Sequence, residues 1–281
     1  RDHFCGNQFD MCTIVNGKSG LCSENCKFCA QSSHYNTGSK VYSLLSEEEI
    51  LADAKKNADQ GVMRYSIVTA GRSLSDGEVD RMCHIIRRIK EEVHISVCVS
   101  FGLLKEDQFR RLKEAGAERV HNNLEASENF FPSVCTSHSF SDKVQAIRAA
   151  QAAGLDVCSG GIMGLGESIE DRIDMALSLR DLGIESIPVN MLNPIPGTPM
   201  EKHESLDEKE MQRIIAVYRF ILPKAFIRLA GGRGLMRDKG KACFMSGANA
   251  AISGDMLTTA GITVDKDKKL LEELDYMIKP L

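Results

Sequence analysis

The sequence predicts a (β/α)8 barrel, an α/β fold of the TIM type, formed by a single domain. Short apolar segments alternate with segments of helical periodicity along almost the whole chain, which is typical of parallel strands buried under helices. Seven or eight such units within 281 residues match the size of a closed barrel. No proline-rich linker divides the chain, so we expect one domain, with a doubly wound open sheet as the structural alternative.

The strands are expected where short apolar runs fall between helical segments. Six of these runs lie at residues 63–70, 94–101, 119–124, 155–162, 185–192 and 225–231. A first strand near 10–16 and a last one near 251–258 would complete a barrel of eight. We expect residues 1–11 to form an N-terminal arm and residues 265–281 a C-terminal segment around a barrel domain that spans 1–281.

The helices are indicated by their ends. Three of them open with a capping box, in which a serine stands three residues before a Glu or Asp: these are Ser46, Ser75 and Ser168. Further helices are expected at about 105–115, 141–153 and 206–221, with a short one within 234–249. Glycine adopts the left-handed conformation that ends helices, and Gly61, Gly116, Gly154 and Gly183 stand at four such ends.

Composition narrows the function classes. The chain has 35 Lys and Arg against 39 Asp and Glu, a net charge of −4, so it lacks the basic footprint of a nucleic-acid-binding protein. No apolar run is long enough to span a membrane, and no signal-peptide pattern is seen. We therefore expect a cytoplasmic protein whose ten cysteines serve metal or redox chemistry rather than disulfides.

The strongest chemical signal is the segment LCSENCKFCAQ, which carries Cys22, Cys26 and Cys29 just after the first expected strand. Structural zinc normally takes four ligands, and a fourth is absent nearby. Three thiolates on a four-iron cluster would instead leave one iron open for chemistry. Loops after barrel strands lie on the catalytic face, so the spacing predicts an iron–sulfur site there.

This loop resembles that of the radical S-adenosylmethionine (SAM) superfamily, and the wider sequence resembles the biotin synthase family within it. The segments that carry the second resemblance, in order and spacing, are NGKSGLCSENCKFCAQSSHY, HNNLEAS, VCSGGIMGLGES, PVNML, FIRLAGGR and CFMSGAN. It implies a [4Fe–4S] cluster whose open iron binds SAM, and reductive cleavage of SAM to a 5′-deoxyadenosyl radical. It further implies sulfur insertion into dethiobiotin from an auxiliary iron–sulfur cluster, a flavodoxin- or ferredoxin-type reductant, and a homodimer.

Carried over position by position, the resemblance assigns Cys22, Cys26 and Cys29 to the [4Fe–4S] cluster. The residues that it implies for SAM are Phe28, Ala70, Gly71, Asn123, Glu125, Lys143 and Met191. Asn123 and Asn190 are the ones implied for dethiobiotin. Lys143 stands where the family commonly has Arg, so the charge is kept but the two-pronged hydrogen bonding is lost.

One position departs from the family pattern. The usual auxiliary cluster is a two-iron cluster held by three cysteines and one arginine, and Cys98, Cys158 and Arg228 match three of these ligands. Ser66 stands where the remaining cysteine is expected. Serine is a poor iron–sulfur ligand, which puts the ordinary two-iron site in doubt.

Barrel geometry suggests a replacement for the missing ligand. Inward side chains form layers contributed by alternate strands, and Cys98, Cys158 and Arg228 fall on the third, fifth and seventh expected strands. The first strand would supply the missing corner, and Cys12 lies on it, with Cys5 close enough in sequence to be a further ligand. We therefore hypothesise an auxiliary cluster of two-iron or four-iron type held by these cysteines; the alternative is that Cys12 is a small buried core residue.

Three functions remain open from the sequence. The first is sulfur insertion, favoured by the Cys98, Cys158 and Arg228 set together with Asn190. The second is another barrel enzyme of the superfamily, similar to a hydrogenase-cluster maturase or a methylornithine synthase, which would need no sulfur source. The third is an iron–sulfur redox protein, which would hold its cluster with four protein ligands and would not cleave SAM.

Overall fold

The strands of the computed structural model close into a parallel barrel, as the sequence predicts. The structure describes residues 1–279; residues 280–281, in the expected C-terminal segment, lie outside the described residues. The first strand, β1 (Gln8–Lys18), pairs with β2 on one side and with β9 on the other, so the sheet closes on itself. The other strands are β2 (Arg64–Thr69), β3 (Ser96–Ser100), β4 (Arg119–His121), β5 (Asp156–Cys158), β6 (Gly161–Met163), β7 (Ser186–Met191), β8 (Phe226–Leu229), β9 (Ala250–Ile252) and β10 (Met277–Ile278).

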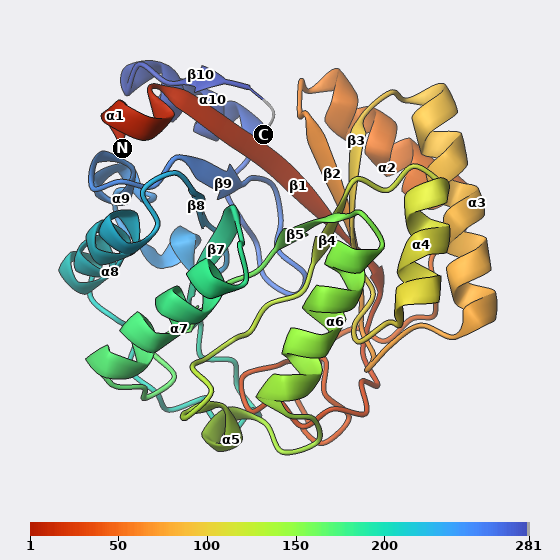
Figure 1. Ribbon diagram of the computed structural model, residues 1–281, viewed down its shortest axis with the longest axis horizontal. Coiled ribbons are helices and arrows are strands. Elements are labelled where there is room, and N and C mark those ends of the chain that lie inside the picture. The colour runs from red at the N-terminus through yellow and green to blue at the C-terminus, as the bar shows by residue number, and fades with distance from the viewer. Residues whose placement is uncertain (280–281) are drawn as a thin grey trace.

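Helices surround the strands, with α2, α3, α4 and α6 on one side and α7, α8 and α9 on the other (Figure 1). Their bounds are α1 (Asp2–Cys5), α2 (Glu47–Asp59), α3 (Asp76–Glu92), α4 (Glu106–Glu114), α5 (Phe131–Val134), α6 (Phe140–Ala152), α7 (Ile169–Asp181), α8 (Glu208–Ile221), α9 (Lys241–Met245) and α10 (Val264–Glu273). A 3-10 turn, η1 (Arg233–Leu235), follows β8. Among residues 1–279, no helix is both long and apolar enough to cross a membrane.

The predicted helix ends are confirmed. Ser46, Ser75 and Ser168 each accept a hydrogen bond from the backbone N–H three residues on, and the acidic side chain there accepts one from the serine backbone N–H. Ser139 does the same at the start of α6. The four predicted stop glycines, Gly61, Gly116, Gly154 and Gly183, all have positive φ.

The fifth predicted strand differs most from expectation. Instead of one strand over 155–162, the chain forms β5 and then, after Gly160, the separate strand β6, which pairs with β7. The backbone of Gly160 passes so close to β7 that a Cβ there would lie 1.9 Å from the Pro188 carbonyl oxygen. A glycine is therefore required where the strand breaks. The last barrel strand, β9, also ends earlier than predicted, and the loop after it lines the barrel mouth.

Alternation along the strands separates two interiors. On β1, Phe9 and Met11 pack in the apolar core between sheet and helices, whereas Asp10 and Cys12 point the other way, into the barrel. On β2, Ile67 joins the apolar core, whereas Arg64 and Ser66 line the barrel interior. A barrel interior is commonly filled with branched apolar side chains, and this one is instead lined with cysteine, arginine and serine.

Candidate functional site

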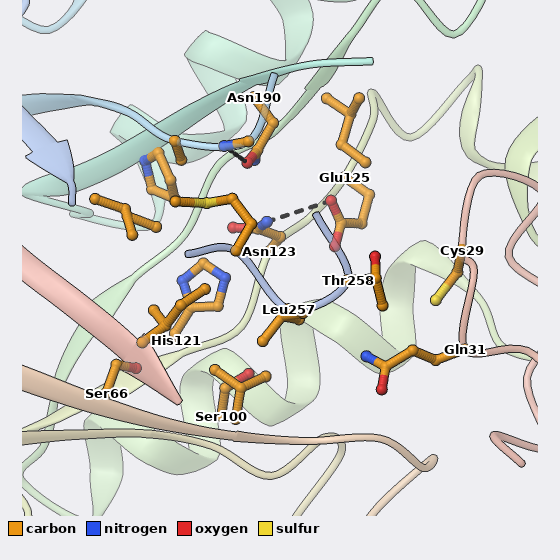
Figure 2. Close-up of a pocket in the computed structure, with 18 of the residues that line it drawn as sticks. Cys29, Gln31, Ser66, Ser100, His121, Asn123, Glu125, Asn190, Leu257 and Thr258 are labelled. Atoms are coloured by element: carbon orange, nitrogen blue, oxygen red, sulfur yellow. Dashed lines mark hydrogen bonds between the residues drawn. The ribbon is translucent and has the colours of Figure 1, made fainter. Parts of the chain in front are cut away.

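A cavity of about 400 Å³ opens at the carboxyl ends of the barrel strands and continues down into the barrel. Figure 2 shows it running from Cys29 and Gln31, past Glu125 and Asn123, to Ser66. The wall contains residues from or just after β1, β2, β3, β4, β7 and β8, which is the face where barrel enzymes place their chemistry.

The predicted cysteine loop forms one wall of the cavity mouth. Cys22 and Cys29 line the cavity, and Cys26 lies behind them; all three are half-buried and free. Backbone hydrogen bonds fold the loop on itself, because the N–H of Cys22 donates to the Gln31 carbonyl at 2.9 Å and the N–H of Cys29 donates to the Cys26 carbonyl at 3.0 Å. The Gln31 amide oxygen accepts from the Gly20 N–H at 3.2 Å, which ties the loop to the end of β1.

The spacing of these sulfurs suits a cluster better than a single ion. Within residues 1–279, one set of three His, Cys, Asp or Glu ligand atoms lies mutually within 4.8 Å, and it is made of Cys26, Cys135 and His138. The sulfurs of Cys22, Cys26 and Cys29 do not form such a set. At least one pair of these three sulfurs is therefore more than 4.8 Å apart. Two metal–sulfur bonds of about 2.3 Å to one ion cannot span that separation, whereas bonds to separate irons of a cluster can.

The residues expected to hold SAM come together on the same cavity wall: Phe28, Ala70, Gly71, Asn123, Glu125, Lys143 and Met191 all line it. The Asn123 amide donates to a Glu125 carboxylate oxygen at 3.3 Å, and the Lys143 ammonium donates to the Asn122 side-chain oxygen at 3.3 Å. Desolvation in the cavity wall raises the pKa of the Glu125 carboxyl, against the opposing charge of Lys143.

Hydrogen bonds to the backbone hold the polar side of the cavity in place. Glu125 has a φ of 70°, an uncommon conformation for a residue with a side chain, and is held there by hydrogen bonds from its N–H to Gly160 and from Ile162 N–H to its carbonyl. Asn190, expected at the substrate, accepts from the Gly231 N–H at 2.8 Å and donates to the Gly161 carbonyl at 3.1 Å. The loop after β4 is thereby joined to the β5–β6 segment, and the loop after β8 to β7, at the cavity.

The cavity floor carries the second predicted set. Cys12, Cys98, Cys158 and Arg228 all line it, each 6% exposed or less. The Arg228 guanidinium donates to the Cys12 sulfur at 3.2 Å and to the Asp10 carboxylate at 2.5 Å. The structure thus brings Cys12 to the same floor as the other three, as the layer argument predicts.

The floor thiols differ in how readily they ionise. Burial opposes ionisation of Cys158, but the hydrogen bond with His121 and the charges of His121, Arg228 and Arg119 outweigh it and lower the thiol pKa to about 6. Burial, together with the neighbouring Cys158, raises the pKa of Cys98 to about 12. Cys158 is therefore the sulfur most ready to bind a metal as thiolate.

Comparison with known proteins decides the family. Residues 18–179 match the radical SAM superfamily, and residues 188–277 match the biotin and thiamin synthesis associated domain. The chain is 62% identical to the biotin synthase of Brachyspira hyodysenteriae, over 99% of this chain and 84% of that protein. It is 57% identical to the biotin synthase of Akkermansia muciniphila, over 99% of this chain and 87% of that protein. The chain belongs to the biotin synthase family of radical SAM enzymes.

Solved structures agree on the fold. A methylornithine synthase superposes with a TM-score of 0.81 at 22% identity, over 100% of this chain and 86% of that one. A FeFe-hydrogenase maturase from Carboxydothermus hydrogenoformans superposes with a TM-score of 0.84 at 18% identity, over 99% of this chain and 69% of that one. Membership of the biotin synthase family makes the chain an enzyme, and implies a [4Fe–4S] cluster, SAM and dethiobiotin as substrate.

Cys5 is the predicted auxiliary-cluster ligand that the structure places away from the cavity. It ends α1, and its sulfur lies 3.7 Å from the Pro223 carbonyl oxygen and 3.5 Å from an Arg219 nitrogen, beyond the end of α8. The arm before β1 packs against this outer corner, so Cys5 lies away from Cys12 despite their closeness in sequence.

Sequence reasoning missed three charged residues of the floor. Arg119 is 1% exposed, and none of its three side-chain nitrogens makes a hydrogen bond; its nearest acid is Asp10, at 3.5 Å. Arg64 and His121 line the same floor. The signal was present in the sequence, because Arg64, Arg119 and His121 occupy inward positions of otherwise apolar strands, where an unpaired charge is costly.

Proposed function

We propose that this chain inserts sulfur into dethiobiotin to form biotin, acting as a sulfurtransferase that depends on SAM. The observation that supports the proposal is that a single cavity joins the three-cysteine loop at its mouth to a second set of cysteines at its floor. A sulfur-inserting enzyme needs both a radical source and a sulfur source within reach of one substrate. The biotin synthase family supplies the identity of the substrate.

At the mouth, Cys22, Cys26 and Cys29 would hold the four-iron cluster. When bound, that cluster supplies the electron that cleaves SAM and yields the radical that abstracts hydrogen from dethiobiotin. Lys143 offers a cation for the SAM carboxylate, and the paired Asn123 and Glu125 side chains offer donors and acceptors to ribose and substrate. These side chains have the task of orienting the cofactor and substrate and excluding competing reactions.

At the floor, we propose that Cys12, Cys98 and Cys158 hold the auxiliary cluster with Arg228 beside it. The fit rests on charge: Arg119 and Arg228 share a single carboxylate, Asp10, and Arg64, which pairs with Glu118 at 3.9 Å, lines the same floor. The free nitrogens of Arg119 suit an anionic partner, and a cluster on three thiolates supplies one. The floor offers three thiolates, as the mouth does. We therefore propose that the auxiliary cluster is also of the four-iron type and that it stores the sulfur to be inserted.

Iron counting tests the two sites separately. The protein is reconstituted anaerobically, and iron, sulfide and Mössbauer spectra are compared for wild type, Cys12→Ala and Cys83→Ala. About four irons beyond the SAM cluster are expected in wild type and in Cys83→Ala, and these are lost in Cys12→Ala while the SAM cluster stays. Unchanged iron and sulfide in Cys12→Ala, or about two extra irons in wild type, would contradict the floor assignment.

Product analysis tests the reaction itself. With SAM, dethiobiotin and a low-potential reductant, mass spectrometry should find both 5′-deoxyadenosine and biotin. Release of 5′-deoxyadenosine without any sulfur-containing product would point to a different radical SAM reaction. We also propose a flavodoxin- or ferredoxin-type reductant, a homodimer and a cytoplasmic location, which reduction assays with each carrier, sedimentation and cell fractionation can check.

A further inference from the structure

The loop between α5 and α6 packs directly onto the cysteine loop at the mouth. The Asn25 side-chain oxygen accepts from the backbone N–H groups of Thr136 and Ser137, at 3.0 and 3.1 Å. The Lys27 N–H donates to the Val134 carbonyl at 3.0 Å. The segment of the cysteine loop around Cys26 is therefore held by its partner loop from both sides.

At the centre of this contact lies Cys135, which the sequence had not marked as functional. Its sulfur is 3.7 Å from the Cys26 sulfur, and the side chain is 3% exposed. His138 Nδ1 lies 3.3 Å from the Cys135 sulfur and donates to the Glu24 carboxylate at 2.5 Å. Glu24, in turn, accepts from the Ser137 hydroxyl at 2.8 Å.

The Cys135 thiol proton has two candidate acceptors, the Asn25 side-chain oxygen at 3.4 Å and the Cys26 sulfur at 3.7 Å. His138 Nδ1 cannot accept it, because that nitrogen already carries the proton donated to Glu24; its N–H lies 3.3 Å from the Cys135 sulfur and so turns the thiol proton away from the ring. The Asn25 oxygen and the Ser137 hydroxyl are both engaged with backbone N–H groups, of Thr136 and Ser137 in the first case and of Asn25 in the second. When Cys26 is a thiol, it donates to the Cys135 sulfur at 3.7 Å. A metal-bound Cys26 thiolate has no proton and carries negative charge, so the direction reverses and it becomes the strongest acceptor within reach of the Cys135 thiol.

We propose that Cys135, oriented by His138, is a positioning residue that donates a hydrogen bond to the Cys26 sulfur and raises the reduction potential of the SAM cluster. Donors to cluster sulfurs stabilise the reduced, more negative state and so make the cluster easier to reduce. Neither Cys135 nor His138 lines the cavity, so they act through Cys26 and not on the substrate. The inference rests on the proposed cluster at Cys22, Cys26 and Cys29.

A potentiometric titration followed by electron paramagnetic resonance tests the proposal on the reconstituted full chain. Cys135→Ala removes the donor and should shift the potential of the SAM cluster downward, so that the reduced fraction falls at a fixed reductant poise. Cys135→Ser keeps a donor and should stay near wild type. Cys83→Ala, which removes an equally buried cysteine in α3, controls for loss of packing and should leave the potential unchanged.

SAM cleavage gives a second readout. In Cys135→Ala, 5′-deoxyadenosine release should slow when the reductant is limiting and recover when the reductant is in large excess. Equal potentials in wild type, Cys135→Ala and Cys83→Ala would overturn the inference while leaving the proposed function intact. A wild-type protein that assembles no four-iron cluster at the cysteine loop would instead overturn the proposed function.

Should Cys135→Ala fail to hold the cluster, His138→Phe takes its place. The ring keeps the edge-on packing against Phe131, where the centroids lie 5.5 Å apart, but the nitrogens that orient the thiol are gone. A lower potential in this variant supports the proposal, and an unchanged potential contradicts it.

Discussion

The mouth and the floor of the cavity both gather cysteines, but the chain builds them in different ways. At the mouth, Cys22, Cys26 and Cys29 come from one short loop, are half-buried, and are held by hydrogen bonds within that loop and with the loop between α5 and α6. At the floor, Cys12, Cys98 and Cys158 come from three separate strands and are almost fully buried. The three mouth cysteines are neighbours in sequence, whereas the three floor cysteines come together only when the barrel closes. A different residue at one strand position, such as Ser66, therefore alters the set of side chains at the floor without altering the cysteine loop.

The largest effect is expected at the mouth. Cys22→Ala removes one of three thiolates, so SAM cleavage and biotin formation should both fall to background, because every later step needs the radical. The unfolding midpoint of the cluster-free protein should stay close to wild type, since Cys22 is half-buried in a loop. Product analysis and urea denaturation measure the two quantities. Cys83→Ala serves as the control. Release of 5′-deoxyadenosine by Cys22→Ala would show that Cys22 is not a required ligand of the SAM cluster.

The next effect separates the two regions. Cys158→Ala should abolish biotin formation while SAM cleavage to 5′-deoxyadenosine continues at a rate of the same order as wild type. The physical reason is that, in the proposed function, Cys158 would hold the sulfur source at the floor, whereas the radical is generated at the cysteine loop. Cys243→Ala, another buried cysteine, lies in α9 and should behave as wild type in both assays. Biotin formation by Cys158→Ala at the wild-type rate would mean that the floor is not the sulfur source.

The same contrast explains what the sequence could predict. The helix caps, the glycine stops and the three-cysteine loop are local patterns, and all appear where expected. Cys12 was placed correctly because strand order plus alternation fixes which residues face inward. Cys5 lies away from the floor because the arm packs against the end of α8, which no periodicity encodes. Cys135 was overlooked for the same reason: its contact with Cys26 joins two loops far apart in the sequence.

Arg119 gives a third, smaller effect that tests the charge of the floor. Without the cluster, its nitrogens make no hydrogen bonds, so Arg119→Met should raise the free energy of unfolding of the cluster-free protein by about 1–3 kcal/mol. In the reconstituted protein the same change should weaken retention of the auxiliary iron, because a favourable charge is lost. Urea denaturation and iron counting after gel filtration measure the two results.

A buried arginine with partners provides the matched control. Arg219 donates to four backbone carbonyls and to the Asn249 side chain, so Arg219→Met should destabilise the cluster-free protein and leave the auxiliary iron in place. If Arg119→Met destabilises the cluster-free protein as Arg219→Met does, Arg119 stabilises the fold itself and is not a binding residue for an anionic cluster.

The smallest effect returns to the mouth. Ser139 caps α6, the helix that carries Lys143 into the cavity wall, so Ser139→Ala should cost about 1 kcal/mol of stability and weaken SAM binding slightly, because the first turn of α6 loosens. Ser46→Ala removes the same capping box from α2, which has no residue in the cavity wall, and should cost as much stability with no change in SAM binding. Denaturation and equilibrium binding of SAM to the reconstituted protein compare the two. Equal SAM affinities in both variants would mean that SAM binding does not depend on the stability of the first turn of α6.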